Sequence, residues 1–115
     1  MSVKYIKPSE AVVRDAGHGK SIANFFTKVD GGNMSVAVLS LDDESFVTRR
    51  NSRSDRAYYF LEGKGIFEFD AQNFETEIGS VLFIPKNTKY KMRGRFKSVL
   101  VNSPAFDSAD EEHSE

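Results

Sequence analysis

Three polar side chains in the middle of the chain have types and a spacing suited to binding anions or moving protons. Arg56 and Tyr58 stand two residues apart at the start of a β-prone run, and Tyr90 opens a later one. Residues two apart on a strand share a face, so Arg56, Tyr58 and Phe60 lie together. A guanidinium offers paired donors to a carboxylate or phosphate, and a tyrosine hydroxyl donates or accepts a proton. The spacing predicts that an arginine and a tyrosine lie on one face of a strand, next to a phenylalanine.

The elements that must position these side chains are short strands bounded by turn residues. The run at residues 58–61 is stopped by the segment E-G-K-G at 62–65, and residues 66–69 resume it with large apolar side chains at alternate positions. This pattern predicts two strands folded at a glycine corner. A nearly continuous apolar run at 81–84, opened by Gly79 and closed by Pro85, predicts a buried strand.

The rest of the chain shows the same pattern of short apolar runs separated by turn residues. The segment at 30–33, D-G-G-N, is a strong reversal signal, and residues 4–14 predict either a turn of helix after Pro8 or an irregular arm. Further strands are predicted at 21–29, 34–41, 45–50, 74–78, 89–93 and 96–102. About eight short strands with frequent turns predict an all-β antiparallel barrel or jelly roll.

Composition limits the kinds of protein this chain can be. Its 115 residues fit a single domain, and a formal net charge of -1 argues against a general nucleic-acid binder. Cysteine is absent, which excludes disulfides and thiol nucleophiles. No apolar segment approaches the roughly 20 residues that span a bilayer, so we expect a cytoplasmic protein without a membrane partner. We expect residues 1–106 to form the barrel and its N-terminal arm, and the acidic residues 107–115 a solvated, partly mobile tail.

A stretch of about residues 40–102 resembles the core of the cupins, a superfamily of small β-barrels with two sequence motifs. The first motif places two histidines and a glutamate ahead of a glycine, and the segment Y-F-L-E-G ending at Gly63 resembles its end. The second runs from a glycine over five residues to a proline, and Gly79 and Pro85 have that spacing. The resemblance implies a single-domain cupin jelly-roll β-barrel.

The positions of the family's metal ligands hold other residues. The first-motif glutamate falls on Arg56, and its histidines fall on Arg49 and Asn51, or one residue later on Arg50 and Ser52. The second-motif histidine falls on Tyr90. Catalytic metal sites need neutral imidazoles or carboxylates converging on one point, whereas an arginine brings a fixed positive charge. We therefore predict no metal and no other cofactor.

The resemblance also implies which faces point into the barrel. If Arg56 takes the place of the inward glutamate, strand alternation directs Tyr58 and Phe60 inward and Tyr59 and Leu61 outward. The predicted ligand-binding residues, taken from the motif positions and from alternation around them, are Arg49, Asn51, Arg56, Tyr58, Phe60, Phe67, Phe83, Tyr90 and Met92. Phe69 is a further candidate for the lumen.

Two functions from different classes fit this predicted pocket. The first is a metal-free pocket, without assigned catalysis, that binds a small, anionic metabolite or sugar derivative. The second is an isomerase, epimerase or lyase in which Tyr58 or Tyr90 acts as acid or base and Arg56 stabilises the anion. Structural roles are the alternative for each group: Arg56 pairs with Asp55, Glu62 or another barrel carboxylate, and the tyrosines fill the core.

Three features outside the motifs bear on partners. His18 lies in a glycine-flanked loop, and a metal bound there with Asp or Glu is a third hypothesis. A basic cluster at 86–97 is interpreted as solvated surface rather than a nucleic-acid site, because acidic residues balance it overall. Cupins of this size commonly pair, and outward apolar residues such as Tyr59 and Leu61 favour a homodimer.

Overall fold

The regular elements belong almost entirely to one sheet. A computed structural model describes residues 3–114, which form an eight-stranded antiparallel sheet and three short 3₁₀ helices. In chain order the elements are η1 (Pro8–Glu10), β1 (Val12–Gly17), β2 (Lys20–Phe26), η2 (Lys28–Asp30), β3 (Ser35–Asn51), β4 (Asp55–Glu68), β5 (Asn73–Glu75), β6 (Val81–Ile84), β7 (Tyr90–Ser103), η3 (Ser108–Asp110) and β8 (Glu111–Ser114). None of the described helices is long or apolar enough to cross a membrane.

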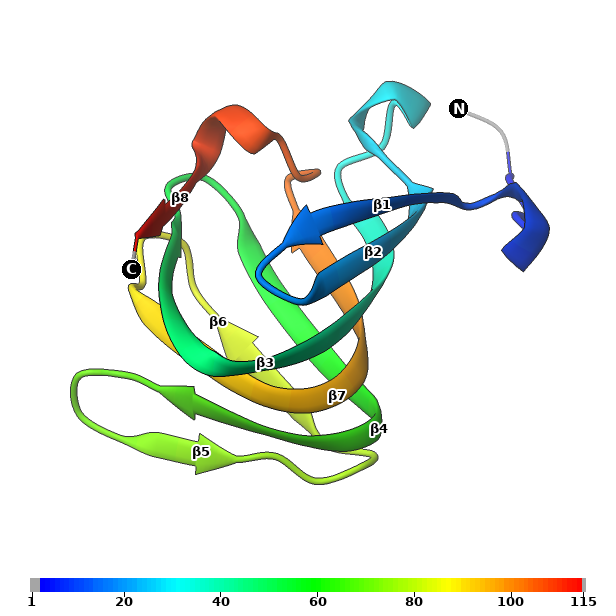
Figure 1. The fold of residues 1–115 in the computed structure, drawn as a ribbon. Helices are drawn as coiled ribbons and strands as arrows, with labels where there is room; N and C mark the ends of the chain where they lie inside the picture. The colour runs from blue at the N-terminus through cyan, green and yellow to red at the C-terminus, as the bar shows by residue number, and fades with distance from the viewer. Residues whose placement is uncertain (1–2, 115) are drawn as a thin grey trace.

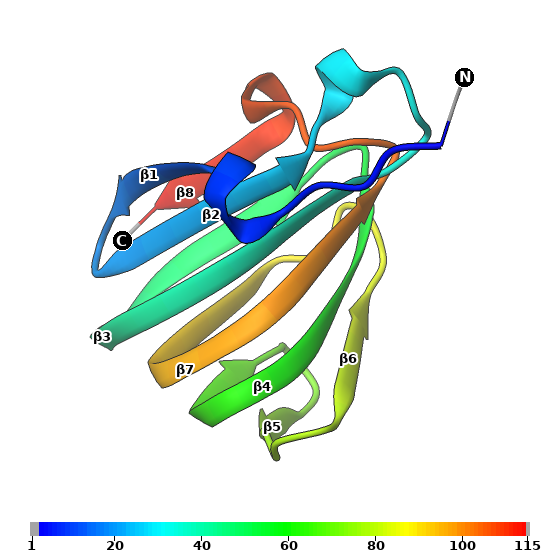
Figure 2. The same ribbon diagram turned by 90° about the vertical axis from the view of Figure 1, so that its right-hand side faces the viewer.

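The sheet curls on itself into a half-open barrel. Its strand order is β1-β2-β3-β7-β4-β5, with β6 paired to β4 and β8 paired to β3. Strands β2, β3, β7 and β4 run side by side in Figure 2. The curl brings the β1–β2 hairpin and the C-terminal strand β8 to the same end of the barrel (Figure 1). The predicted all-β barrel is confirmed.

Long, bent strands replace several pairs of short strands predicted from the sequence. The predicted strands at 34–41 and 45–50 are one strand, β3, whose pairing with β7 shifts register between Asp43 and Val47. The predicted corner at Gly63 lies inside β4, next to a register shift between Phe60 and Glu62. The predicted break before Phe96 likewise lies within β7. These segments bend the strands without ending them.

Two glycines let β4 and β7 coil tightly against each other. Gly63 has φ +74° and Gly94 has φ +123°, conformations that side chains with a Cβ rarely adopt. A Cβ on Gly63 would lie 2.1 Å from the carbonyl oxygen of Arg95, and one on Gly94 would lie 2.6 Å from that of Lys64. These glycines, which the sequence pattern assigns to turns, therefore lie inside continuous strands and allow them to coil.

The N-terminal region also differs from expectation. After the 3₁₀ turn η1, residues 12–17 form strand β1, which pairs with β2 at the edge of the sheet. Val12 and Val13 of this strand are 69% and 66% exposed. The turn of helix predicted after Pro8 is present as η1, but the strand at 12–17 was not predicted, because a strand without a buried face lacks the alternation that a sequence pattern detects.

The interior is filled by a cluster of aromatic rings. Phe67 is completely buried and Phe60 is 1% exposed, with ring centroids 5.7 Å apart in an edge-to-face arrangement. Phe96 packs on both rings, and Phe69 packs against the cluster from the side. Burial on this scale is the main contribution to stability in a sheet of this size.

One predicted lumen residue, Phe83, lies outside the barrel. Strand β6 pairs with β4 so that Ile84 stands opposite Arg56, and this register sets Ile84 on the inner face. Alternation then directs Phe83 outward, where it is 60% exposed, while Ile84 is 2% exposed. The continuous apolar run at 81–84 gave no alternation from which to choose a face. The outward orientation predicted for Tyr59 and Leu61 is observed.

The C-terminal residues pack on the barrel, and the prediction of a solvated tail over 107–115 is wrong for the described part. Residues 108–110 form η3 and residues 111–114 form β8, which pairs with residues 48–51 of β3. The side chain of Glu111 is only 6% exposed. A charged sequence predicts solvation unless a buried partner of opposite charge exists, and here that partner is Arg56. Glu115 lies outside the described residues.

Candidate functional site

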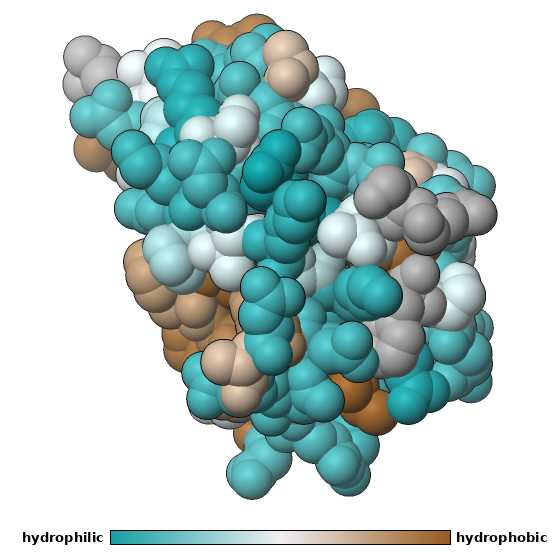
Figure 3. All heavy atoms as spheres, turned by 90° about the vertical axis from the view of Figure 1, so that its left-hand side faces the viewer, coloured by the Kyte–Doolittle hydropathy of each residue, from teal (hydrophilic) through white to brown (hydrophobic). Residues whose placement is uncertain are grey.

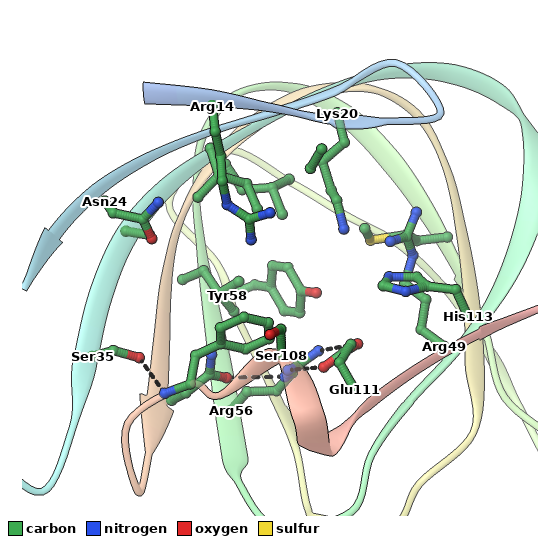
Figure 4. Close-up of a pocket in the computed structure, with 18 residues that line it drawn as sticks. Arg14, Lys20, Asn24, Ser35, Arg49, Arg56, Tyr58, Ser108, Glu111 and His113 are labelled. Atoms are coloured by element: carbon green, nitrogen blue, oxygen red, sulfur yellow. Dashed lines mark hydrogen bonds and ion pairs between the residues drawn. The ribbon is translucent and has the colours of Figure 1, made fainter. Parts of the chain in front are cut away.

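A cavity of about 180 Å³ lies between the β1–β2 hairpin, the inner face of the sheet and strand β8. Its walls combine apolar side chains such as Leu39 and Met92 with a dense group of charged ones. The charged and titratable lining residues are Arg14, Lys20, Arg49, Arg56, Glu111 and His113, and Tyr58 completes the polar wall. Figure 4 shows Arg14 and Lys20 entering from the hairpin, with Arg56 and Glu111 on the opposite side.

Arg56 is the most heavily bonded side chain of the site. It is 5% exposed, and its Nη1 and Nη2 donate to the two carboxylate oxygens of Glu111 at 3.3 and 2.7 Å. Its Nε donates to Oδ1 of Asn102 at 3.0 Å, and Nη1 also donates to the Tyr90 hydroxyl at 2.9 Å. Of the alternatives drawn from the sequence, pairing with a barrel carboxylate is the one observed, and that carboxylate is Glu111 rather than Asp55 or Glu62.

Two tyrosine hydroxyls continue this network into the core. The hydroxyls of Tyr58 and Tyr90 lie 2.7 Å apart, and Tyr90 also accepts from Arg56. Burial raises the pKa of Tyr58 well above its usual value, and Tyr90 adds to the effect, outweighing the lowering by Arg56. Arg56 does lower the pKa of this tyrosine, but burial has the larger effect. Tyr58 stays protonated and acts as a hydrogen-bonding group.

Asn51 supports the site from its edge. Its Nδ2 donates to Glu111 at 3.0 Å, and its Oδ1 accepts from the backbone N–H groups of Arg53 and Ser54. The same side chain therefore closes the turn after β3 and orients the carboxylate that Arg56 needs. Asn51 does not line the cavity.

Arg49 differs from Arg56 because part of its guanidinium is unsatisfied. The residue is 2% exposed and lines the cavity, yet its Nε finds no hydrogen-bond partner among the described residues. It stands opposite His113 in the pairing of β3 with β8, so the two side chains share a face. Burial lowers the pKa of His113, and the charges of Lys20 and Arg49 lower it further. A neutral imidazole thus lies beside a buried cation.

Lys20 supplies a third cation from the first residue of β2. Burial lowers its pKa to about 7, and Arg49, Arg56 and Arg14 lower it too, against an opposing effect of Glu111. Glu111 is the only carboxylate among the described residues that line the cavity, and it is already paired with Arg56. The cavity therefore carries excess positive charge.

The predicted ligand-binding residues divide into two groups in the structure. Arg49, Arg56, Tyr58 and Met92 line the cavity. Four others are buried behind its wall or at its edge, namely Asn51, Phe60, Phe67 and Tyr90, while Phe83 is on the outer surface. Sequence reasoning missed Arg14, Lys20, Glu111 and His113, which lie on peripheral strands far from both motifs. Of these four residues, only Lys20 could have been singled out from the local sequence, because it directly follows the glycine-flanked turn at 17–19.

The side chains at the positions that resemble the cupin metal motifs do not suit a metal ion. Arg49 and Arg56 place fixed positive charges where imidazoles or carboxylates would be needed, and the nearby carboxylate of Glu111 is committed to Arg56. Within residues 3–114, His, Asp and Glu side chains nowhere gather in a group of three or more that could hold an ion, and His18 is no exception.

Replacing the carboxylate of Glu111 tests the buried ion pair. We expect Glu111→Gln to lower the free energy of unfolding by about 3–5 kcal/mol, because it leaves the buried guanidinium of Arg56 without a counter-charge. Urea titration followed by tyrosine fluorescence measures this change.

Glu112 offers a matched control on the same strand. It pairs with Arg50 but its side chain is 60% exposed, so Glu112→Gln should cost no more than about 1 kcal/mol. Equal losses in the two variants would show that the Arg56–Glu111 pair has no special role in stability.

Comparison with known proteins gives one relative by sequence. No family model matches the chain. The uncharacterized protein MJ1618 of Methanocaldococcus jannaschii is 25% identical over 88 residues, a match that covers 76% of this chain and 66% of that protein. The chain thus spans slightly less than two thirds of the length of this relative.

Solved structures give a stronger likeness. A variant of PAC13 from Streptomyces, solved with uridine, has a TM-score of 0.82 at 24% identity, covering 100% of this chain and 93% of that one. Pac13 is a nucleoside dehydratase. Ectoine synthase from P. lautus has a TM-score of 0.79 at 18% identity, covering 100% of this chain and 91% of that one. Both are cupin-fold proteins, and the chain described here has the cupin fold.

Proposed function

We propose that this cupin-fold protein binds a small anionic metabolite in the cavity beside Arg49, without help from a metal ion. The observation that carries the proposal is the buried guanidinium of Arg49, whose Nε lacks a partner among the described residues. A buried charged donor left unpaired is costly, and a carboxylate or phosphate would satisfy it. Arg56, the anchor first predicted from the sequence, already has a carboxylate.

The remaining charges support the same ligand class. Lys20 and Arg14 face the cavity from the hairpin, across from the wall that holds Arg56 and Glu111 (Figure 4). An anion between them would be attracted by at least two side chains at once. It would also favour the ammonium form of Lys20, so binding would take up a proton above pH 7.

Size and neighbouring structures narrow the ligand further. A volume of about 180 Å³ corresponds to about six water molecules at their share of liquid volume, which suits a sugar-sized metabolite. Asn24, Ser35 and Asn102 add neutral hydrogen-bonding groups to the lining. The similar barrel of PAC13 has been solved with uridine. We therefore favour an anionic sugar derivative, with a uronic acid as one example.

Calorimetric titration with matched ligands tests the binding proposal. We expect glucuronate or galacturonate to bind measurably and neutral glucose or galactose to bind at least tenfold more weakly, because only the anions can satisfy Arg49. Arg49→Gln should weaken binding of the anions by about tenfold or more. Binding should also weaken as the pH rises through about 7, where Lys20 loses its proton.

Arg95→Gln is the control for this experiment. The side chain of Arg95 is 84% exposed and lies outside the cavity, so its loss changes the net charge by the same amount without touching the site. The proposal fails if no anion of this class binds, or if the two arginine variants weaken binding equally.

A lyase, isomerase or epimerase is the second candidate function. The supporting observation is the hydrogen-bonded series Tyr58, Tyr90 and Arg56 next to the cavity, in a fold that also serves the nucleoside dehydratase Pac13. Tyr58, which stays protonated, would donate a hydrogen bond or a proton to a leaving oxygen. Fold likeness alone does not determine a reaction, so this candidate depends on the tyrosine geometry.

Replacing Tyr90 tests the second candidate. Anionic sugar derivatives that bind would be incubated with the protein and followed by mass spectrometry for loss of water or isomerisation. We expect any turnover to show a bell-shaped pH dependence that loses one limb in Tyr90→Phe, because this variant breaks the link between Arg56 and Tyr58. Ligand binding without turnover in either protein would favour the pure binding function.

We also propose that the protein forms a homodimer through the outer face of β4 and β6. Tyr59, Leu61, Val81 and Phe83 are exposed there, by 38–65%. Most of the surface in Figure 3 is hydrophilic, with hydrophobic residues gathered at the left of the view.

Sedimentation analysis should show a dimer that Phe83→Glu converts to a monomer, because the charge would be buried at the contact. A wild-type monomer would contradict the proposal.

A further inference from the structure

The position of Lys20 is fixed by a close approach of the β1–β2 hairpin to β3. Gly17, His18 and Gly19 all have positive φ and form the hairpin turn. A Cβ on Gly19 would lie 2.1 Å from the carbonyl oxygen of Asp42, whose N–H in turn donates to the oxygen of Gly19 at 2.9 Å. The glycine allows the hairpin to seat on β3, and Lys20, the next residue, projects into the cavity.

Four of the strands around Lys20 present charged or titratable groups to it. Arg14 comes from β1, Arg49 from β3 and Arg56 from β4, while β8 contributes Glu111 and His113. Figure 4 shows the amine between the guanidinium groups of Arg14 and Arg49. Within residues 3–114 the amine forms no ion pair, since the cavity's carboxylate is bonded to Arg56. Three guanidinium groups against one engaged carboxylate disfavour a fourth positive charge.

This environment gives Lys20 the properties of a nucleophile. Burial and the neighbouring guanidinium groups lower its pKa to about 7, so roughly half of the molecules hold a free amine at that pH. An ordinary exposed lysine, with a pKa near 10.4, has less than about a thousandth of its amine free at pH 7. Desolvation and adjacent cations are the means by which enzymes activate lysines toward carbonyl groups.

We propose that Lys20 forms an imine with the carbonyl carbon of a small oxo acid or anionic aldehyde whose acid group is held by Arg49. This inference rests on the proposed anion-binding function, and it adds the carbonyl group to the description of the ligand. The amine lone pair attacks the carbonyl carbon, and the carbonyl electrons pass to the oxygen. One amine proton moves to that oxygen to give a carbinolamine, and the second leaves nitrogen as the hydroxyl departs as water, so a C=N bond remains and no oxidant or reductant is required.

Two neighbours can carry the proton during this step. His113 is neutral because its pKa is lowered, so its imidazole can accept the proton from the attacking nitrogen. Tyr58 stays protonated and can donate a hydrogen bond to the carbonyl oxygen as charge develops there. Both side chains line the same cavity as Lys20.

Reductive trapping tests the proposal on the intact chain. The protein would be incubated with pyruvate or glyoxylate and cyanoborohydride, and the adducts mapped by peptide mass spectrometry. We expect Lys20 to carry at least about tenfold more adduct at pH 7 than Lys28, which is 56% exposed and paired with Asp107. Labelling of Lys20 should reach half its maximum near pH 7, whereas labelling of Lys28 should still rise above pH 9.

Variants and a non-carbonyl analogue separate this proposal from the binding proposal. Lys20→Met should abolish the cavity adduct, Lys28→Met should not, and lactate should protect Lys20 by occupying Arg49 without reacting. If lactate binds in an Arg49-dependent manner but Lys20 is trapped no more than Lys28, the imine proposal is overturned and anion binding stands. If Lys20 carries equal amounts of adduct in the wild type and in Arg49→Gln, Lys20 is a nucleophile but the proposed binding of the acid group by Arg49 is wrong.

Discussion

The buried ion pair between Arg56 and Glu111 is the interaction on which the rest of the site depends. A guanidinium inside a small barrel must be paired, because the loss of its hydration is otherwise uncompensated. The pair joins β4 to β8, and its further bonds reach Asn102 and Tyr90 on β7. One arginine therefore ties the C-terminal strand to the centre of the sheet and closes one side of the cavity.

Satisfying Arg56 in this way determines the character of the cavity. The carboxylate that neutralises Arg56 is not available to Arg49 or Lys20, and no other carboxylate lines the cavity among the described residues. The Nε of Arg49 is left unsatisfied, and the neighbouring guanidinium groups add to the burial that lowers the pKa of Lys20. Folded proteins tolerate such imbalances mainly at functional sites, where a ligand supplies what the protein lacks.

The fold keeps the polar end and the apolar end of the barrel apart. The aromatic cluster around Phe67 packs the interior without lining the cavity, while the hairpin and β8 bring the charged groups to the other end. The stacked and edge-to-face rings give a rigid base on which Tyr58 is held. Rigid support of this kind lets a few polar side chains hold a fixed geometry in a small chain.

Local periodicity predicted the all-β barrel, and the resemblance to the cupin motifs predicted the inward faces around Arg56, Tyr58 and Tyr90 and showed which residues stand at the motif positions. Tertiary structure decided the rest. Glu111 and Lys20 reach the site from peripheral strands, and their contacts depend on the curl of the sheet, which no local pattern encodes. Phe83 faces outward because pairing of β6 with β4 sets its register. Whether a charge is solvated or buried depends on the partner it meets, and only the folded chain brings partners distant in sequence together.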